Sequence, residues 1–157
     1  MKIEYNGEMV EAYDLIISKK TAEQIIRGEK EFEIRDFTKF YQDKFGDPEK
    51  VKQNIQAEKE GRDDDFVAPF KDTKFVHFRD YGTFTLDVRI DFIGFYFMTK
   101  EDIEYLNEEI DFHDFDNEWQ QYAKNPDKAP AFFIMHIAEI IRQSDDNERV
   151  WKKRSRY

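Results

Sequence analysis

The clearest hydrophobic pattern in the chain is an alternation between residues 83 and 92. Apolar side chains take every second position and polar side chains the positions between them, as in a strand with one buried face. A second strand pattern covers Thr73–Arg79, and the Gly-containing segment 80–82 between the two runs is typical of a tight turn. We therefore predict a β-hairpin, with a bulge or bend near Gly94, where the phase of the alternation changes.

The N-terminal region predicts a strand, a short helix and a second strand. Residues 14–18 form a β-branched run. The helical pattern that follows contains Thr21 and Gln24 at the spacing of a capping box, and Gly28 can adopt the left-handed conformation that ends a helix. Residues 31–37 then alternate between polar and apolar, which predicts a strand.

Residues 38–72 have a different character. Asp47 and Pro48 are typical of a helix start and Gly61 of a helix end, but few residues between them are apolar. We interpret 38–72 as an insertion that leaves the core and serves as a lid or a partner surface. The alternative is a solvated decoration without a role.

The remaining elements complete a mixed α+β chain. A helix is predicted from Thr99, a short helix at 117–124 and a buried strand at 131–141, where almost every residue is apolar. The length of 157 residues is typical of one domain, which we place at 1–144. A basic tail, 145–157, follows it.

The amino-acid composition excludes or disfavours several classes of function. The net charge of −10 disfavours sequence-blind binding to nucleic acid, so any such site would be a local basic cleft. The absence of cysteine excludes disulfides, thiolate metal sites and a cysteine nucleophile. The chain shows no secretory signal and no apolar run of membrane-spanning length, so we predict a soluble, cytoplasmic protein with no membrane partner.

The candidate site is the charged strand after Gly28. Lys30 and Arg35 supply donors for a carbonyl, phosphate or carboxylate group, and Glu33 supplies an acceptor or a base. The alternative is a solvated strand face whose ion pairs contribute under ~1 kcal/mol each.

The segment from Leu15 to Arg35 reads L-I-I-S-K-K-T-A-E-Q-I-I-R-G-E-K-E-F-E-I-R. It resembles the opening signature of the ASCH family, in which an apolar strand precedes the pattern Y/T-A-E-x-I-x-x-G-x-K-x-x-E-x-R. The matching positions are Ala22, Glu23, Ile25, Gly28, Lys30, Glu33 and Arg35. The resemblance implies a PUA-like small mixed β-barrel with peripheral helices.

The resemblance also implies a function, which is recognition of RNA or a nucleotide in a polar cleft. The implied ligand-binding residues are Gly28, Lys30, Glu33 and Arg35. In this hypothesis the cationic groups meet phosphate or carbonyl oxygens, and the glutamate accepts from an amine or a ribose hydroxyl. An exposed aromatic side chain, Tyr41, Phe78 or Tyr81, is expected to stack on the base.

Two other functions stay open. Some small family members are amidohydrolases that act on acetylated cytidine, and their catalytic lysine corresponds to Lys30. Those enzymes have threonine where this chain has Glu33, which argues against the activity here. The third possibility is a protein-interaction module whose acidic surface imitates nucleic acid.

Other chemistry is less well supported by the sequence. His77, His113 and His136 are scattered without metal-ligand spacing, so we predict no metal and no cofactor. Residues 111–116 resemble the start of an EF-hand but lack its glycine, and no glutamate follows at the required position. The tail carries Trp151 among basic residues, which suits either nucleic-acid contact or a solvated terminus.

Overall fold

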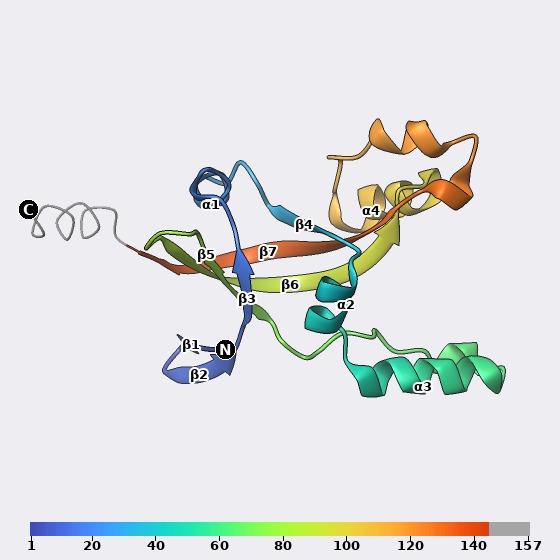
Figure 1. Cartoon of the computed structure of the whole chain (residues 1–157), viewed down its shortest axis with the longest axis horizontal. Helices are drawn as coiled ribbons and strands as arrows, with labels where there is room; N and C mark the ends of the chain where they lie inside the picture. Colours follow the sequence, from blue (N-terminus) through green and yellow to red (C-terminus); the bar gives the residue numbers. More distant parts are fainter. Residues whose placement is uncertain (145–157) are drawn as a thin grey trace, which may run out of the picture. The chain divides into compact units, whose positions relative to one another are not determined.

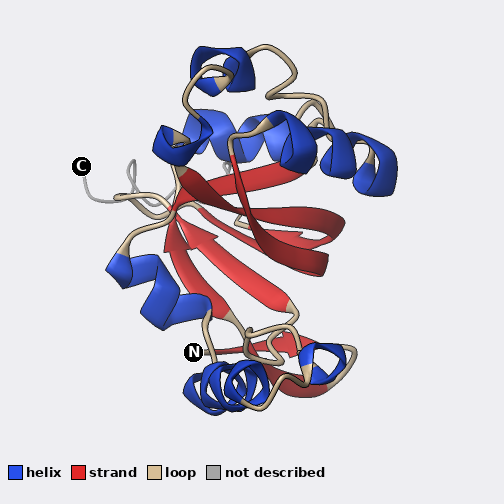
Figure 2. Cartoon of the chain, turned by 90° about the vertical axis from the view of Figure 1, so that its right-hand side faces the viewer, coloured by secondary structure: helices blue, strands red, loops and turns tan. Residues whose placement is uncertain are grey.

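The computed structural model describes residues 1–144 of the chain (Figure 1). Its α-helices are α1 (Lys19–Ile26), α2 (Lys39–Phe45), α3 (Pro48–Lys59) and α4 (Lys100–Ile110). Its strands are β1 (Lys2–Tyr5), β2 (Glu8–Glu11), β3 (Tyr13–Ile16), β4 (Phe32–Asp36), β5 (Phe75–Arg79), β6 (Thr85–Phe97) and β7 (Ala131–Gln143). Short 3-10 helices are η1 (Asp63–Asp65), η2 (Glu118–Tyr122) and η3 (Pro126–Lys128). The mixed α+β class is thus confirmed, as the helix and strand colours of Figure 2 make visible.

The strands form two sheets. β1 and β2 pair antiparallel in a small sheet of their own, and the other five strands follow the order β3-β5-β6-β7-β4. β3 runs parallel to β5, whereas β5 runs antiparallel to β6. The predicted hairpin is therefore confirmed, as β5 and β6. The assignment to a PUA-like barrel remains a prediction.

The described chain divides into two compact units, each assembled from separate segments. Unit 1 comprises Met1–Glu33, Asp72–Phe92 and the described part of His136–Tyr157; unit 2 comprises Ile34–Lys71 and Ile93–Met135. Residues 38–72 thus fall almost wholly in unit 2, together with α4.

The predicted strand-helix-strand pattern is present as β3, α1 and β4, with a shifted helix start. The Ser18 hydroxyl accepts a hydrogen bond from the backbone N–H of Thr21 at 3.1 Å, so Ser18 caps α1. The capping box predicted at Thr21 and Gln24 is wrong, because Thr21 already lies inside the helix. Ala22 and Ile25 form the buried stripe of α1, as their spacing predicts.

The side chain of Asp80 stabilises the turn between β5 and β6, which the Asp80 N–H also closes by donating to the Phe84 carbonyl at 3.2 Å. The carboxylate of Asp80 accepts hydrogen bonds from the backbone N–H groups of Gly82 and Phe84, at 2.8 and 3.1 Å. Beyond the turn, β6 continues from Thr85 to Phe97 as one strand through Gly94. The predicted bulge does not interrupt it, and even-numbered side chains remain the less exposed set. The buried side chains of unit 1 include Leu15, Val76, Phe78, Phe84, Leu86, Val88 and Ile90.

In unit 2 the predicted helix within 38–72 is confirmed as α3. Asp47 caps it by accepting from Glu49 N–H at 2.9 Å, and Pro48 occupies the first helical position. The segment is anchored rather than wholly solvated, because Phe45, Ala57 and Phe70 are buried. The rest of the unit 2 core includes Ile103, Leu106, Phe112, Phe132, Phe133, Ile134 and Met135.

The other predicted elements also lie where expected. α4 begins after Thr99, whose hydroxyl accepts from the N–H of Asp102. The apolar run 131–141 forms most of β7, and its first half is buried. In the described part of the chain, no helix combines the length and the apolar character that a membrane crossing requires.

Candidate functional site

The predicted site begins at a helix end built around Gly28. This glycine has a φ of 75°, and its N–H donates to the carbonyl of Ile25 at 3.0 Å. The N–H groups of Glu29 and Lys30 both donate to the carbonyl of Gln24, at 2.9 and 3.2 Å. The left-handed glycine therefore ends α1 as predicted and turns the chain toward β4.

Two of the predicted polar residues follow in unit 1. Lys30 is half-buried, and in the described part of the chain its ammonium group forms no hydrogen bond or ion pair. Glu33 is only 7% exposed. A buried carboxylate loses its hydration, so the alternative of a solvated strand face does not hold for Glu33. The Ile137 N–H of β7 donates to the carbonyl of Glu31, the residue directly before β4, at 2.8 Å.

Arg35, the remaining cation of the predicted site, belongs to unit 2. Its Nη1 donates to the Tyr41 hydroxyl at 2.8 Å, and its guanidinium carbon lies 5.6 Å from the centroid of the Tyr41 ring. The same aromatic side chain thus offers Arg35 both a hydrogen bond and a cation–π contact. Since Lys30 and Glu33 lie in unit 1, the convergence of all three side chains on one hollow stays a prediction.

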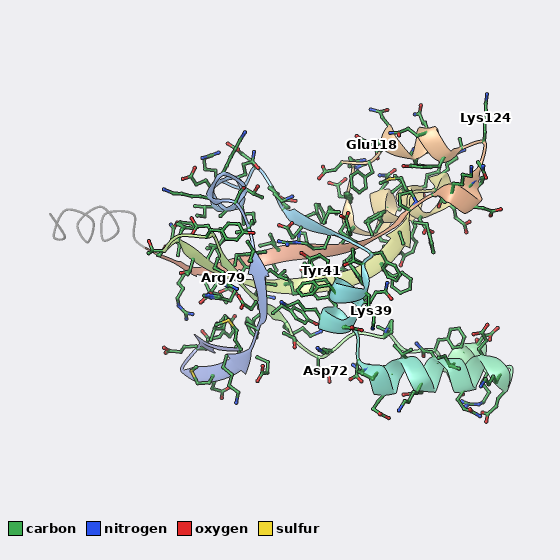
Figure 3. All side chains as sticks on the ribbon, in the orientation of Figure 1. Lys39, Tyr41, Asp72, Arg79, Glu118 and Lys124 are labelled. Carbon is green, nitrogen blue, oxygen red and sulfur yellow. The ribbon has the colours of Figure 1, made fainter. Side chains whose placement is uncertain are left out.

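A basic and aromatic surface surrounds Tyr41. Thr38 caps α2, and Figure 3 labels Lys39 and Tyr41 on the helix that follows. The Phe40 ring is 63% exposed and meets the Tyr41 ring edge to face at 5.0 Å. Lys44 Nζ lies 5.1 Å from the centroid of Phe40. We call these residues, Arg35, Lys39, Phe40, Tyr41 and Lys44, the α2 surface.

The three aromatic residues proposed to stack on a base differ in how exposed they are. Phe78 is completely buried in unit 1 and is therefore excluded. Tyr81 is 91% exposed at the tip of the hairpin, and Tyr41 is half-buried in the α2 surface. Phe40 was not among the predicted aromatic residues, although its position between Lys39 and Lys44 indicates a base-stacking ring.

A second feature of unit 2 is an apolar pocket of about 500 Å³. Its floor is aromatic: the Phe133 ring lies 4.9 Å from that of Phe37, and 6.2 Å from that of Phe70. α3 contributes Val51 and Ile55 to its wall. The sequence did not predict this pocket, because its lining comes from segments far apart in the chain.

Unit 1 instead carries a network of charges on β5, β6 and β7. His77 Nδ1 lies 2.5 Å from one oxygen of Asp87, and Arg142 Nη1 donates to the other at 2.6 Å. Nearby, the Glu139 carboxylate accepts from Arg89 and from Tyr5, each at 3.0 Å. Hydrogen bonds from Arg89 and then Tyr5 lower the pKa of Glu139.

The other two histidines also face carboxylates. His136 Nδ1 lies 2.7 Å from Asp91, and the two ring nitrogens of His113 lie 2.9 and 2.8 Å from Asp116 and Asp111. Hydrogen bonds to Asp116 and Asp111 raise the pKa of His113. Within residues 1–144, no three acidic or histidine side chains are arranged to hold a metal ion.

Two tyrosines have strongly shifted pKa values. Burial raises the pKa of Tyr13 and that of Tyr96 to about 12 each. Both hydroxyls stay protonated at neutral pH, so neither side chain is suited to act as a base.

The acidic surface proposed for a protein partner corresponds best to α4. Glu101, Glu104 and Glu108 follow one another at helical spacing on this helix, and Tyr105 lies between them. The basic tail with Trp151 lies outside the described residues.

Comparison of the chain with protein-family models, curated proteins and solved structures finds no significant match.

Proposed function

We propose that this protein binds single-stranded RNA or a nucleotide, and that the α2 surface is the part of unit 2 that contacts the base and its phosphate. The observation that carries the proposal is the exposed Phe40 ring, placed between Lys44 and the Arg35–Tyr41 pair. An exposed ring flanked by cations is the arrangement by which proteins bind single strands without reading a duplex.

Each side chain has a distinct role in this proposal. Phe40 stacks on a base, an interaction that contributes about 1–3 kcal/mol per base. Lys44 meets a phosphate oxygen, and Arg35, held in place by the Tyr41 hydroxyl, donates to a phosphate or to a base carbonyl. Lys39 contributes less, because it forms an ion pair with Asp43 at 3.0 Å.

The charge of the chain limits the affinity. A net charge of −10 repels a polyanion at long range, so binding depends on the local cations and on stacking. With two or three phosphate contacts, the logarithm of affinity should fall with the logarithm of salt concentration at a slope of about −2.

The direct test is fluorescence anisotropy of a labelled single-stranded RNA at low salt, with the wild-type chain and Phe40→Ala. We expect the substitution to weaken binding about 5- to 100-fold, and Lys44→Ala to weaken it less and to reduce the salt slope. Phe97→Ala is the matched control, because Phe97 is an exposed phenylalanine of unit 2 outside the α2 surface. No measurable RNA binding by the wild type, or equal binding by Phe40→Ala, would refute the proposal.

The contribution of unit 1 is tested separately at Lys30. If the polar strand after Gly28 also contacts the ligand, Lys30→Ala should weaken RNA binding, while Lys20→Ala on α1 should not. The same variant examines the amidohydrolase alternative: release of acetate from acetylcytidine by the wild type, lost in Lys30→Ala, would favour catalysis over binding.

A further inference from the structure

The pocket of unit 2 differs chemically from the α2 surface. Its volume of about 500 Å³ lies within the range of small-molecule sites, and most of its lining is aromatic or aliphatic. Several lining side chains are partly exposed, which is unusual for residues of this type. They are Phe37, Val51, Ile55, Phe66, Val67 and Phe95.

The amides of the pocket are already engaged in holding its wall together. Asn54 Nδ2 donates to the Val67 carbonyl at 2.8 Å, and Asn54 Oδ1 accepts from the Val67 N–H at 2.9 Å. Gln42 Nε2 donates to the carbonyl of Phe37 at 3.3 Å. These bonds link α3 to the segment that carries Val67, so the pocket is a built feature whose amides have protein partners.

Glu58 is the only charged side chain among the residues that line the pocket. In the described part of the chain, its carboxylate has no ion-pair partner. It lies in the last turn of α3, where the helix dipole adds further negative potential. The acidic run 63–65 directly precedes Phe66, another lining residue.

Three cations near the pocket have protein partners. Lys50 Nζ donates to the Phe70 carbonyl at 2.7 Å, and Lys71 Nζ donates to the Lys44 carbonyl at 2.8 Å. Arg62 forms ion pairs with Glu60 and Asp65. No lysine or arginine lines the pocket, so an anion entering it would lose its hydration without a cationic partner in the lining, whereas a cation would meet Glu58.

From this geometry we propose that the pocket binds a small amphipathic organic cation, with its apolar body on the phenylalanine floor and its amine against Glu58. The proposal does not rest on RNA binding, because the residues that decide it, Ile55 and Glu58, are outside the α2 surface. The occupant is a free small molecule rather than a peptide, since the volume matches a single ligand of modest size.

The test compares two probes with the same apolar body and opposite charge. Decylamine and decyl sulfate are titrated into the full chain by isothermal calorimetry, below the concentration at which either forms micelles. We expect decylamine to bind with a stoichiometry of one and decyl sulfate to bind at least tenfold more weakly. Equal affinities, or no saturable binding of decylamine, would overturn the proposal.

Substitutions in the pocket test whether decylamine binds there. Glu58→Gln should weaken decylamine about five- to tenfold and leave decyl sulfate nearly unchanged, while E58K should reverse the preference. Glu49→Gln is the matched control, because Glu49 is exposed on the same helix outside the pocket lining. Ile55→Ala should weaken both probes. Because Ile55 and Glu58 are exposed, none of these changes removes a buried core side chain.

Decylamine binding that is unaffected by both Glu58→Gln and Ile55→Ala would place the amine elsewhere on the acidic surface, and the proposal would fail. A lysine-containing peptide that competes with decylamine more strongly than free amines do would also contradict it, because the occupant would then be a protein partner.

Discussion

The two ends of strand β6 differ in the chemistry of their odd-numbered side chains. In unit 1 the odd-numbered residues of β6 are polar: Asp87, Arg89 and Asp91 each form an ion pair or hydrogen bond with a neighbouring strand. In unit 2 the odd-numbered residues Phe95 and Phe97 are apolar and partly exposed. One strand thus carries a charged network in one unit and apolar surface in the other.

Ligand binding is expected at the apolar pocket of unit 2 rather than at the charged network of unit 1. In the charged network, Asp87 and Glu139 already have protein partners, so these carboxylates offer little to a ligand. In the apolar pocket, by contrast, the packing is incomplete: Phe133 is buried, whereas Phe95, which also lines the pocket, remains exposed. Exposed apolar surface beside the carboxylate of Glu58 favours the binding of a ligand.

The largest expected effect comes from removing the floor of the pocket. Phe133 is 2% exposed and its ring contacts those of Phe45, Phe70 and Phe95. Phe133→Ala should lower the free energy of unfolding by about 3–5 kcal/mol in urea denaturation. Phe95→Ala, at an exposed position of the same pocket, should cost only about 1 kcal/mol. Similar costs for the two substitutions would show that the floor is not a packed core.

The next largest effect on stability is expected in the charged network, where two His–Asp pairs can be compared. His77–Asp87 and His136–Asp91 have comparable distances, 2.5 and 2.7 Å, but the Asp87 side chain is 7% exposed and the Asp91 side chain 49%. Asp87→Ala should destabilise the fold by about 2 kcal/mol, because His77 and Arg142 lose a buried partner. Asp91→Ala should change stability by less than about 0.5 kcal/mol. Equal values would mean that burial does not set the difference.

A smaller effect is expected at the start of α3, which supplies one wall of the pocket. Asp47→Ala removes the carboxylate that accepts from the N–H groups of Glu49 and Lys50, which should cost about 1 kcal/mol in chemical denaturation. Asp47→Ser should restore most of the loss, because serine also caps helices. If the cap positions the pocket wall, Asp47→Ala should also weaken decylamine binding.

The smallest effect concerns an exposed cluster of charges in unit 2, which lies outside both the apolar pocket and the charged network. Hydrogen bonds to Asp116 and Asp111 raise the pKa of His113 above 6.5, and an NMR titration of its ring protons should show this. Since the folded pKa is the higher one, the stabilisation is complete below the unfolded pKa and is lost as pH rises through the folded pKa. Asp111→Asn should move the pKa of His113 back toward 6.5. An unshifted pKa of His113 in the wild type would contradict the expected pH dependence.

The local elements of this protein were predictable because short-range chemistry determines them. Gly28 ends α1, Asp47 caps α3 and Thr99 caps α4, and each acts through backbone groups within a few residues. The start of α1 was misplaced because Ser18 and Thr21 are both good caps, and only the backbone conformation at Ser18 distinguishes them.

The sequence by itself determined the α+β class, the β5–β6 hairpin and the turn that presents Lys30. It could not show that Glu33 is buried, that Phe40 rather than Phe78 is the exposed ring, or that Phe37, Phe70 and Phe133 surround a pocket. Those features depend on contacts between residues far apart in the chain, and neither local propensity nor periodicity specifies such contacts. Burial and cavities are therefore decided only when the segments pack together.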